Sequence, residues 1–254
     1  MRVPLRRSGL LFVFLLAAGF VRLGLWQLDR LADRREANAR RAAALALPPL
    51  EVDLHRIPPP SGADVFWRRV RVRGAWDPGR EIVVRGRSHL GSPGIELLTP
   101  LRADSSAVLV RRGWLPAADG VAADLAGARI DPRAGTVVVE GIALPGEPPG
   151  PVPSRRLRFA TGPRVVLGAA DLDAAADGLP YPLAPFIIHP LPGGSDSAGR
   201  EAGAPVPLPV PELTDGPHLL YAMQWFGFAA LALGAALLLP RAAAGRRAPP
   251  LEEP

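Results

Sequence analysis

Cysteine and lysine are both missing from this chain of 254 residues, and histidine occurs only four times. Without a thiol the protein has no disulfide, thiolate metal site or CxxC redox site. No two histidines have the spacing of a metal-binding pair, and the GxSxG, HExxH, Walker and helix-opening GxGxxG motifs do not occur. The sequence therefore gives little support for a hydrolase, a zinc enzyme or a nucleotide-binding enzyme.

The part of the chain that can form a folded domain also has little excess charge of either sign. The net charge is +6, but residues 26–217 carry 23 Arg against 22 acidic residues, so the excess lies at the two ends. A nucleic-acid interface needs that excess on the folded domain, and we expect no nucleic-acid partner. All 30 basic residues are arginine, and Ala, Gly and Pro are abundant. This composition indicates a GC-rich bacterial genome.

Two long apolar runs are present instead. Residues 9–25 contain one charge, Arg22, which lies near the end of the run, where its long side chain can reach the membrane interface. We predict that residues 9–25 form a transmembrane helix. A cleaved signal peptide, with cleavage near residues 17–19, is the alternative, although the apolar run continues past that point.

The second run, residues 218–239, has no charged residue and predicts a second transmembrane helix. Thr214 or Asp215 can cap it, and Pro217 suits its first turn. Arginines precede the first run and follow the second, at Arg2, Arg6, Arg7, Arg241, Arg246 and Arg247. The positive-inside rule then places both termini in the cytoplasm of a bacterial plasma (inner) membrane.

This topology makes residues 1–8 and 240–254 cytoplasmic tails and puts residues 26–217 on the periplasmic or outer face. Within 26–217, alternating apolar residues and regular turn signals predict strands at 66–76, 81–87, 95–101, 107–115, 136–144, 156–160, 165–167 and 186–189. Helical patterns cover 26–47, as an extension of the first helix, and 169–176. Proline-rich connectors occupy 48–60, 145–153 and 190–217. The fold class is an α+β membrane protein, with two transmembrane helices enclosing an antiparallel sheet or small barrel.

One histidine stands out by its position. At 100° per residue, Tyr221, Ala222 and Trp225 share the face of His218 at the start of the second helix, while Gln224 lies off that face. A neutral imidazole above two aromatic rings suits a large flat amphiphile, and it is a natural axial ligand for haem iron. An ordinary aromatic belt at the membrane interface explains the same residues.

The outer end of the first helix carries Trp26, Gln27 and Arg30. Arg30 and Arg34 share one helix face and suit carboxylates such as haem propionates. Lipid headgroups would satisfy these arginines equally well, and a Trp and an Arg that end a membrane helix are also ordinary interfacial anchors.

Several separate motifs occur in an order that spans nearly the whole chain. They are Gly24, Trp26, Gln27 and Arg30 as G-x-W-Q-x-x-R, Gly74 in a V-x-G strand, GSPGIELLTPL at 91–101, RGWLP at 112–116 and HLLYAMQWF at 218–226. Together they resemble the Surfeit locus protein 1 family of cytochrome c oxidase assembly factors. The family usually has Asn two residues before the helix histidine, where this chain has Gly216.

The resemblance implies a non-enzymatic factor that binds haem a and aids its insertion into the catalytic subunit of the oxidase. His218 would be the axial ligand of the iron, and Tyr221, Gln224, Trp225, Trp26 and Arg30 would shape the site. The implied partners are the catalytic subunit, the haem a synthase and membrane lipid. A scaffold that holds an assembly intermediate without touching haem is the alternative, and an enzyme acting on lipid or peptide in the outer leaflet is a third hypothesis.

Overall fold

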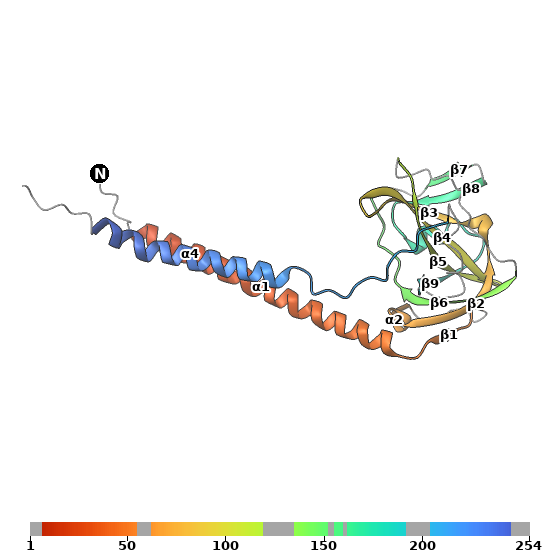
Figure 1. Ribbon diagram of the computed structural model, residues 1–254, viewed down its shortest axis with the longest axis horizontal. Coiled ribbons are helices and arrows are strands. Elements are labelled where there is room, and N and C mark those ends of the chain that lie inside the picture. The colour runs from red at the N-terminus through yellow and green to blue at the C-terminus, as the bar shows by residue number, and fades with distance from the viewer. Residues whose placement is uncertain are drawn as a thin grey trace, which may run out of the picture. The chain divides into compact units, whose positions relative to one another are not determined.

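The computed structural model describes residues 7–54, 62–118, 135–151, 155–159, 162–191 and 204–244. The chain divides into two compact units, one made of residues 1–40 and 213–254 and the other of residues 41–212. The first is a helical hairpin and the second is rich in strands (Figure 1).

The hairpin consists of α1 (Arg7–Ala46) and α4 (His218–Ala244). They are antiparallel, because hydrogen bonds and ring contacts join Arg34 to Thr214 near one end and Phe20 to Trp225 farther along. The residues most buried between them recur every seven positions: Ala17, Gly24, Leu31 and Asn38 on α1, and Ala222, Ala229 and Ala236 on α4. A seven-residue spacing keeps one seam of each helix facing its partner.

Small residues on this seam let the helices approach closely. A Cβ atom added to Gly24 would lie 2.5 Å from Cε1 of Phe226, so the ring of Phe226 occupies the space that a side chain at position 24 would need. Phe20, Trp225 and Phe228 form an aromatic cluster beside this contact, with ring centroids 5.7–5.8 Å apart.

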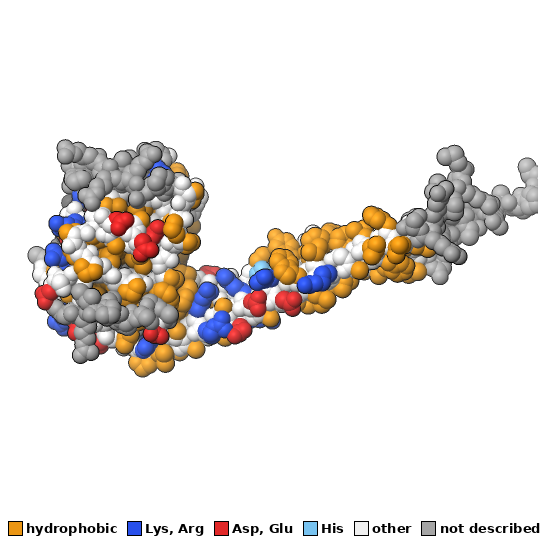
Figure 2. All heavy atoms as spheres, turned by 180° about the vertical axis from the view of Figure 1, so that it is seen from behind, with side chains coloured by type: hydrophobic (Ala, Val, Ile, Leu, Met, Phe, Trp, Pro, Cys, Tyr) orange, Lys and Arg blue, Asp and Glu red, His pale blue; other side chains and the backbone are white. Residues whose placement is uncertain are grey.

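Most other apolar side chains of the hairpin point outward. Orange side chains cover the half of the hairpin next to the chain termini, whereas blue and red side chains gather on the remaining part of α1 (Figure 2). Both helices are long and apolar enough to cross a membrane. The expectation of two apolar helices flanking a β-rich domain is confirmed, and α1 continues without a break through residues 26–46, as its helical pattern predicted.

The strand-rich unit holds a nine-stranded sheet in the order β1-β2-β6-β9-β5-β4-β3-β8-β7. Its strands are β1 (Leu50–Val52), β2 (Arg69–Trp76), β3 (Ile82–His89), β4 (Ser92–Ala103), β5 (Ser106–Pro116), β6 (Thr136–Leu144), β7 (Arg155–Phe159), β8 (Gly162–Leu167) and β9 (Leu183–Pro190). A further pairing of β2 with β4 closes β2, β6, β9, β5 and β4 into a barrel.

Apolar residues that alternate with exposed residues along the strands fill the core of the barrel. In β2, Val70 and Val72 are fully buried and Trp76 is nearly so, while Arg73, between them in the sequence, is exposed. Phe186 and Ile188 of β9 join the same apolar cluster. The period of two that predicted β2 thus separates core residues from surface residues in the folded protein.

Three features were not predicted. β1 lies within the proline-rich stretch 48–60, for which we expected no regular structure, and the short helix α2 (Gly62–Val65) follows it. β1 forms because Leu50–Val52 pair with β2 and bury Val52. The pairs β1–β2, β3–β8 and β5–β9 are parallel, whereas the sequence suggested antiparallel strands. A short 3-10 helix, η1 (Pro78–Arg80), precedes β3, and the predicted helix at 169–176 is limited to α3 (Leu172–Ala176).

The prediction that Thr214 or Asp215 caps the second helix is wrong. α4 begins at His218, so Thr214 and Asp215 lie outside the capping position. The carboxylate of Asp215 instead accepts a hydrogen bond from Nε of Arg35 at 2.8 Å, and the carbonyl oxygen of Thr214 accepts hydrogen bonds from Arg34 and Asn38 at 3.1 and 2.9 Å. These residues fasten α4 to α1, which a helix considered alone could not reveal.

Candidate functional site

His218 lies at the first position of α4 and is half-buried against α1. Its Nδ1 is 2.9 Å from Oε1 of Gln27. Because an amide oxygen can only accept, Nδ1–H donates this hydrogen bond, so the neutral form of the ring carries its proton on Nδ1. The other ring nitrogen, Nε2, therefore keeps a lone pair that a metal can use.

The edge of the imidazole that carries Nε2 lies near Gly216. A Cβ atom added to Gly216 would lie 3.7 Å from Nε2 and 3.6 Å from Cδ2 of the imidazole. Gly216 has a φ of +69°, in the left-handed region that Gly adopts without strain and Asn tolerates. The glycine at this position, where the family that the sequence resembles usually has Asn, thus satisfies the backbone and adds no side-chain atom beside the Nε2 edge of the ring.

Trp225, two turns along α4 from His218, packs between the helices. Its ring stacks on Phe20 of α1 with an interplanar angle of 24° and meets Phe228 edge-on. Trp225 is therefore partly buried and helps to hold α4 against α1.

Tyr221 and Gln224 have a different position. Both are exposed, Tyr221 at 45% of its surface, beside the exposed side chains of Leu219, Leu220 and Met223. The first two turns of α4 therefore present an apolar surface with one phenol and one amide on the outside of the hairpin.

Trp26 and Arg30 contact each other on α1. The Arg30 guanidinium lies 5.8 Å from the centroid of the Trp26 ring and forms an ion pair with Asp33 at 3.3 Å. Within the described residues, neither is joined to His218 by a hydrogen bond, ion pair or ring contact. The structure thus connects His218 and Trp225 to α1 through Gln27 and Phe20.

Gln27 was not among the predicted site residues. Two signals pointed to it: its place in the G-x-W-Q-x-x-R motif, and its position between Gly24 and Leu31, three and four residues away on the seam. Recognising the second signal requires knowing that α1 and α4 pack antiparallel with residue 27 opposite residue 218.

The strand-rich unit contains a buried charge cluster, made of Glu96, Arg111, Arg87 and Glu147. Glu96 is only 1% exposed and pairs with Arg111 at 2.8 Å and Arg87 at 3.4 Å. Burial raises the pKa of Glu96, and the two arginines oppose that rise. Burial alone would also raise the pKa of Glu147, but hydrogen bonds from Arg87 and the Ala170 N–H outweigh it, and the pKa is lowered. The cluster joins β3, β4 and β5 to the segment after β6.

His189 of β9 lies near this cluster and is buried. Its Nε2–H donates to the carbonyl oxygen of Leu208 at 3.1 Å, which attaches the connector before α4 to the barrel. Burial lowers the pKa of His189, and the positive charge of Arg111 lowers it further. The ring is therefore neutral at pH 7 and has a structural role.

The RGW block has a structural position as well. Trp114 is buried, and Gly94 of β4 lies directly against its indole ring. Trp114 also pairs with Val206 of the connector, donating and accepting backbone hydrogen bonds at 2.8 and 2.7 Å. Gly113, with a φ of +130°, allows the close approach of Val206. Trp114 thus belongs to the core, as its place at a strand end suggested.

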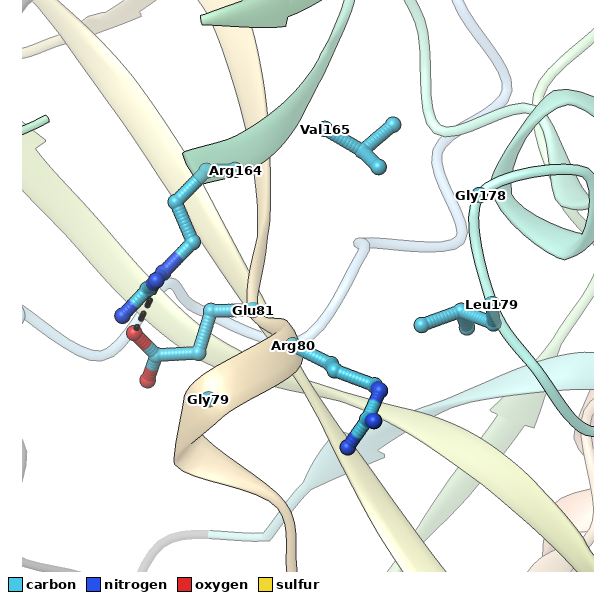
Figure 3. Close-up of a pocket in the computed structure, with 7 residues that line it drawn as sticks. All are labelled: Gly79, Arg80, Glu81, Arg164, Val165, Gly178 and Leu179. Carbon is cyan, nitrogen blue, oxygen red and sulfur yellow. Dashed lines mark ion pairs between the residues drawn. The ribbon is translucent and has the colours of Figure 1, made fainter. Parts of the chain in front are cut away.

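A cavity of about 300 Å³ opens beside η1 and β8 (Figure 3). It is lined by Gly79, Arg80, Glu81, Arg164, Val165, Gly178 and Leu179. Burial raises the pKa of Glu81, while its ion pair with Arg164 at 3.7 Å and a hydrogen bond from Thr99 oppose the rise. The other ionisable side chains of the lining are arginines, which do not act as bases at neutral pH. This lining offers no acid and base pair for the hypothesised outer-leaflet enzyme.

Comparison with known proteins agrees with this architecture. The family model described as the SURF1 family matches residues 14–230, from the first apolar helix through the β-rich unit and into α4. The chain belongs to the SURF1 family. This family is generally associated with the assembly of cytochrome oxidase.

Three SURF1-like proteins illustrate the similarity. A SURF1-like protein of Rickettsia felis is 25% identical over 213 residues, which cover 82% of this chain and 86% of the relative. An uncharacterized SURF1-like protein of Mycobacterium tuberculosis is 29% identical over 224 residues, covering 84% and 74%. A SURF1-like protein of Monosiga brevicollis is 31% identical over 156 residues, covering 56% and 58%.

Proposed function

We propose that this SURF1-family protein is a membrane-anchored assembly factor for haem-copper cytochrome c oxidase, which binds haem a through His218 and aids its insertion into the catalytic subunit. The observation that supports this proposal is the Nδ1–H···Oε1 hydrogen bond from His218 to Gln27, which leaves Nε2 as a lone-pair donor. Histidines that ligate metals commonly donate their second ring N–H to such an acceptor.

The residues around His218 suit an amphipathic porphyrin. The imidazole would supply the axial ligand, and the exposed apolar surface of Leu219, Leu220 and Tyr221 would contact the flat apolar macrocycle. Gln224 and Trp225 would shape the same end of α4. Trp26 and Arg30 would contact the polar edge of the haem or the lipid headgroups, since a guanidinium binds carboxylates and phosphates alike.

The proposed topology has α1 and α4 crossing the bacterial plasma membrane, with both termini in the cytoplasm and the β-rich unit on the other side. It is supported by the apolar surface of the hairpin and by the arginines that flank its two spans. His218 then lies at the non-cytoplasmic interface of the plasma membrane, where a hydrophobic pigment can reach it from the bilayer.

A carrier must also release its cargo. His218 is the one histidine of the hairpin, and the described residues hold no cluster of three or more His, Cys, Asp or Glu side chains that could bind a metal more firmly. A single protein ligand holds iron less firmly than the paired histidines of a recipient site, so exchange toward the catalytic subunit is favourable. The proposed partners are therefore the catalytic subunit, the haem a synthase as the source of the pigment, and membrane lipid.

The test is an absorption spectrum of the full chain, purified in detergent after co-expression with the haem a synthesis enzymes. We expect a haem a spectrum that His218→Ala abolishes or alters. His89→Ala serves as the control, because His89 lies in β3 and contacts Trp114 of the β-rich unit. A spectrum that is identical in wild type and His218→Ala would refute the assignment of His218 as the ligand.

A second candidate function is a scaffold that holds an oxidase subunit without touching haem. It is favoured by Leu90, which is 93% exposed at the β3–β4 turn with a φ of +50°, a conformation unfavourable for leucine. An exposed apolar side chain on a strained turn suits a contact with another protein. This function predicts that the subunit co-purifies equally with wild type and His218→Ala, and that no pigment accompanies either.

A further inference from the structure

One side chain of α1 determines how His218 is presented. We infer that Gln27 is a positioning residue, which holds the imidazole proton on Nδ1 and thereby presents Nε2 to a metalloporphyrin. The part of this inference that concerns the ligand rests on the proposed function. The part that concerns the proton depends on the hairpin alone.

The geometry specifies one tautomer. A neutral imidazole carries its proton on either nitrogen, and the hydrogen bond made by one nitrogen decides which form is populated. Oε1 of Gln27 lies 2.9 Å from Nδ1 and can only accept. Removing this acceptor would free the ring to rotate and to place its proton on Nε2, the nitrogen that must be unprotonated to bind iron.

The seam holds Gln27 in place. Gly24, one turn before it, is covered by the ring of Phe226, and Leu31, one turn after it, is buried against α4. Gln27 is itself half-buried, so few other positions are open to its side chain. The turn of α1 that carries Gln27 is thus packed against α4 on both sides of that residue.

The neutral amide also suits a carrier better than a carboxylate would. A carboxylate on Nδ1–H raises the basicity of the ligating imidazole and strengthens its hold on the metal. An amide fixes the same tautomer and orientation without adding a charge. Gln27 therefore combines correct presentation of Nε2 with a bond that a recipient site can displace.

The space next to Nε2 supports the same assignment. Gly216 is the residue whose missing Cβ would come within 3.7 Å of Nε2. Nδ1 is thus occupied by Gln27, and the Nε2 side is bordered by a glycine.

The first measurement needs no haem. ¹⁵N spectra of the full chain with labelled histidine, in detergent at pH 8, report which nitrogen of each ring is protonated. We expect His218 to be in the Nδ1–H form in wild type, to shift substantially to the Nε2–H form in Gln27→Leu, and to keep the Nδ1–H form in Gln27→Glu, which retains an acceptor. An unchanged His218 tautomer in Gln27→Leu would overturn the inference.

The second measurement is titration with haemin, ferric protoporphyrin IX, followed by absorbance. Loss of a partner of this kind weakens metal binding by about 10- to 100-fold, and we expect Gln27→Leu to bind at least about tenfold more weakly, with Gln27→Glu binding as tightly as wild type or more tightly. Asn38→Leu is the matched control, because it removes an α1–α4 amide hydrogen bond, to the Thr214 carbonyl, three turns away from Gln27. Equal weakening by Asn38→Leu would show a general effect of the hairpin and overturn the positioning role.

The two hypotheses fail in distinguishable ways. If His218→Ala binds haemin as wild type does, the proposed ligand is wrong whatever the tautomer. If His218→Ala loses binding while Gln27→Leu retains both the Nδ1–H form and full affinity, the proposed function survives and the positioning inference is overturned.

Discussion

The buried carboxylates of the β-rich unit and His218 of the hairpin differ in the number and charge of their partners. In the β-rich unit, buried carboxylates are surrounded by arginines: Glu96 meets Arg111 and Arg87, and both arginines also reach Glu147. In the hairpin, His218 meets one neutral amide, and its Nε2 has no hydrogen bond or ion pair among the described residues. The buried carboxylates, each held by opposite charges, have a structural role, whereas the half-buried His218 has one ring nitrogen held by Gln27 and is suited to bind a ligand through the other.

The largest expected effect is on the buried charge cluster. Glu96→Ala removes the main partner of Arg111, which is itself largely buried, and loss of one member of a buried pair costs about 3–5 kcal/mol. We expect a large fall in the free energy of unfolding of the full chain, measured by denaturant titration. The control is Glu36→Ala, which removes an exposed ion pair with Arg40 and should cost less than about 0.5 kcal/mol. Similar effects of the two substitutions would show that burial does not distinguish the cluster.

The hairpin seam should be next in sensitivity. Gly24→Ala introduces a Cβ 2.5 Å from the Phe226 ring, and overpacking of this kind costs about 1–3 kcal/mol. Gly19→Ala adds the same atom where nothing lies within 4 Å, so it should not destabilise the hairpin, and the higher helix propensity of Ala should stabilise it slightly. Thermal unfolding of the two variants in the same detergent measures the difference. Equal melting temperatures would contradict the close packing of α1 against α4.

The smallest effect concerns pH. Burial lowers the pKa of His189, so the neutral ring stabilises the folded protein. This contribution is complete above pH 6.5, the ordinary pKa of histidine, and is lost as the pH falls toward the lower pKa of the folded state. Wild type should therefore lose stability between pH 7.5 and 5.5, and His189→Gln, which can still donate to the Leu208 carbonyl, should lose less. His89→Gln is the control, since His89 is only half-buried. If wild type and His189→Gln lose stability equally over this range, the buried imidazole is not responsible.

Local patterns predicted most of the individual elements. β6 has the bounds that its alternation predicted, and the helical pattern of 26–47 continues α1 to Ala46. β1 could not be predicted, because three residues in a proline-rich stretch carry no periodic signal and become a strand only when β2 lies beside them. The parallel pairs have the same origin, since strand direction depends on where the chain returns and not on the residues of the strand.

The sequence by itself determined that two apolar helices flank a β-rich unit, and it singled out His218, because hydrophobic length, alternation and motif order are local properties of the chain. Only the tertiary structure decided which residues complete the candidate site. It set Gln27 of α1 opposite His218 of α4, and it left Trp26 and Arg30 in contact with each other. Residues 191 positions apart meet because buried residues that recur every seven positions bring the two helices together, and the register between those helices is a property of the pair.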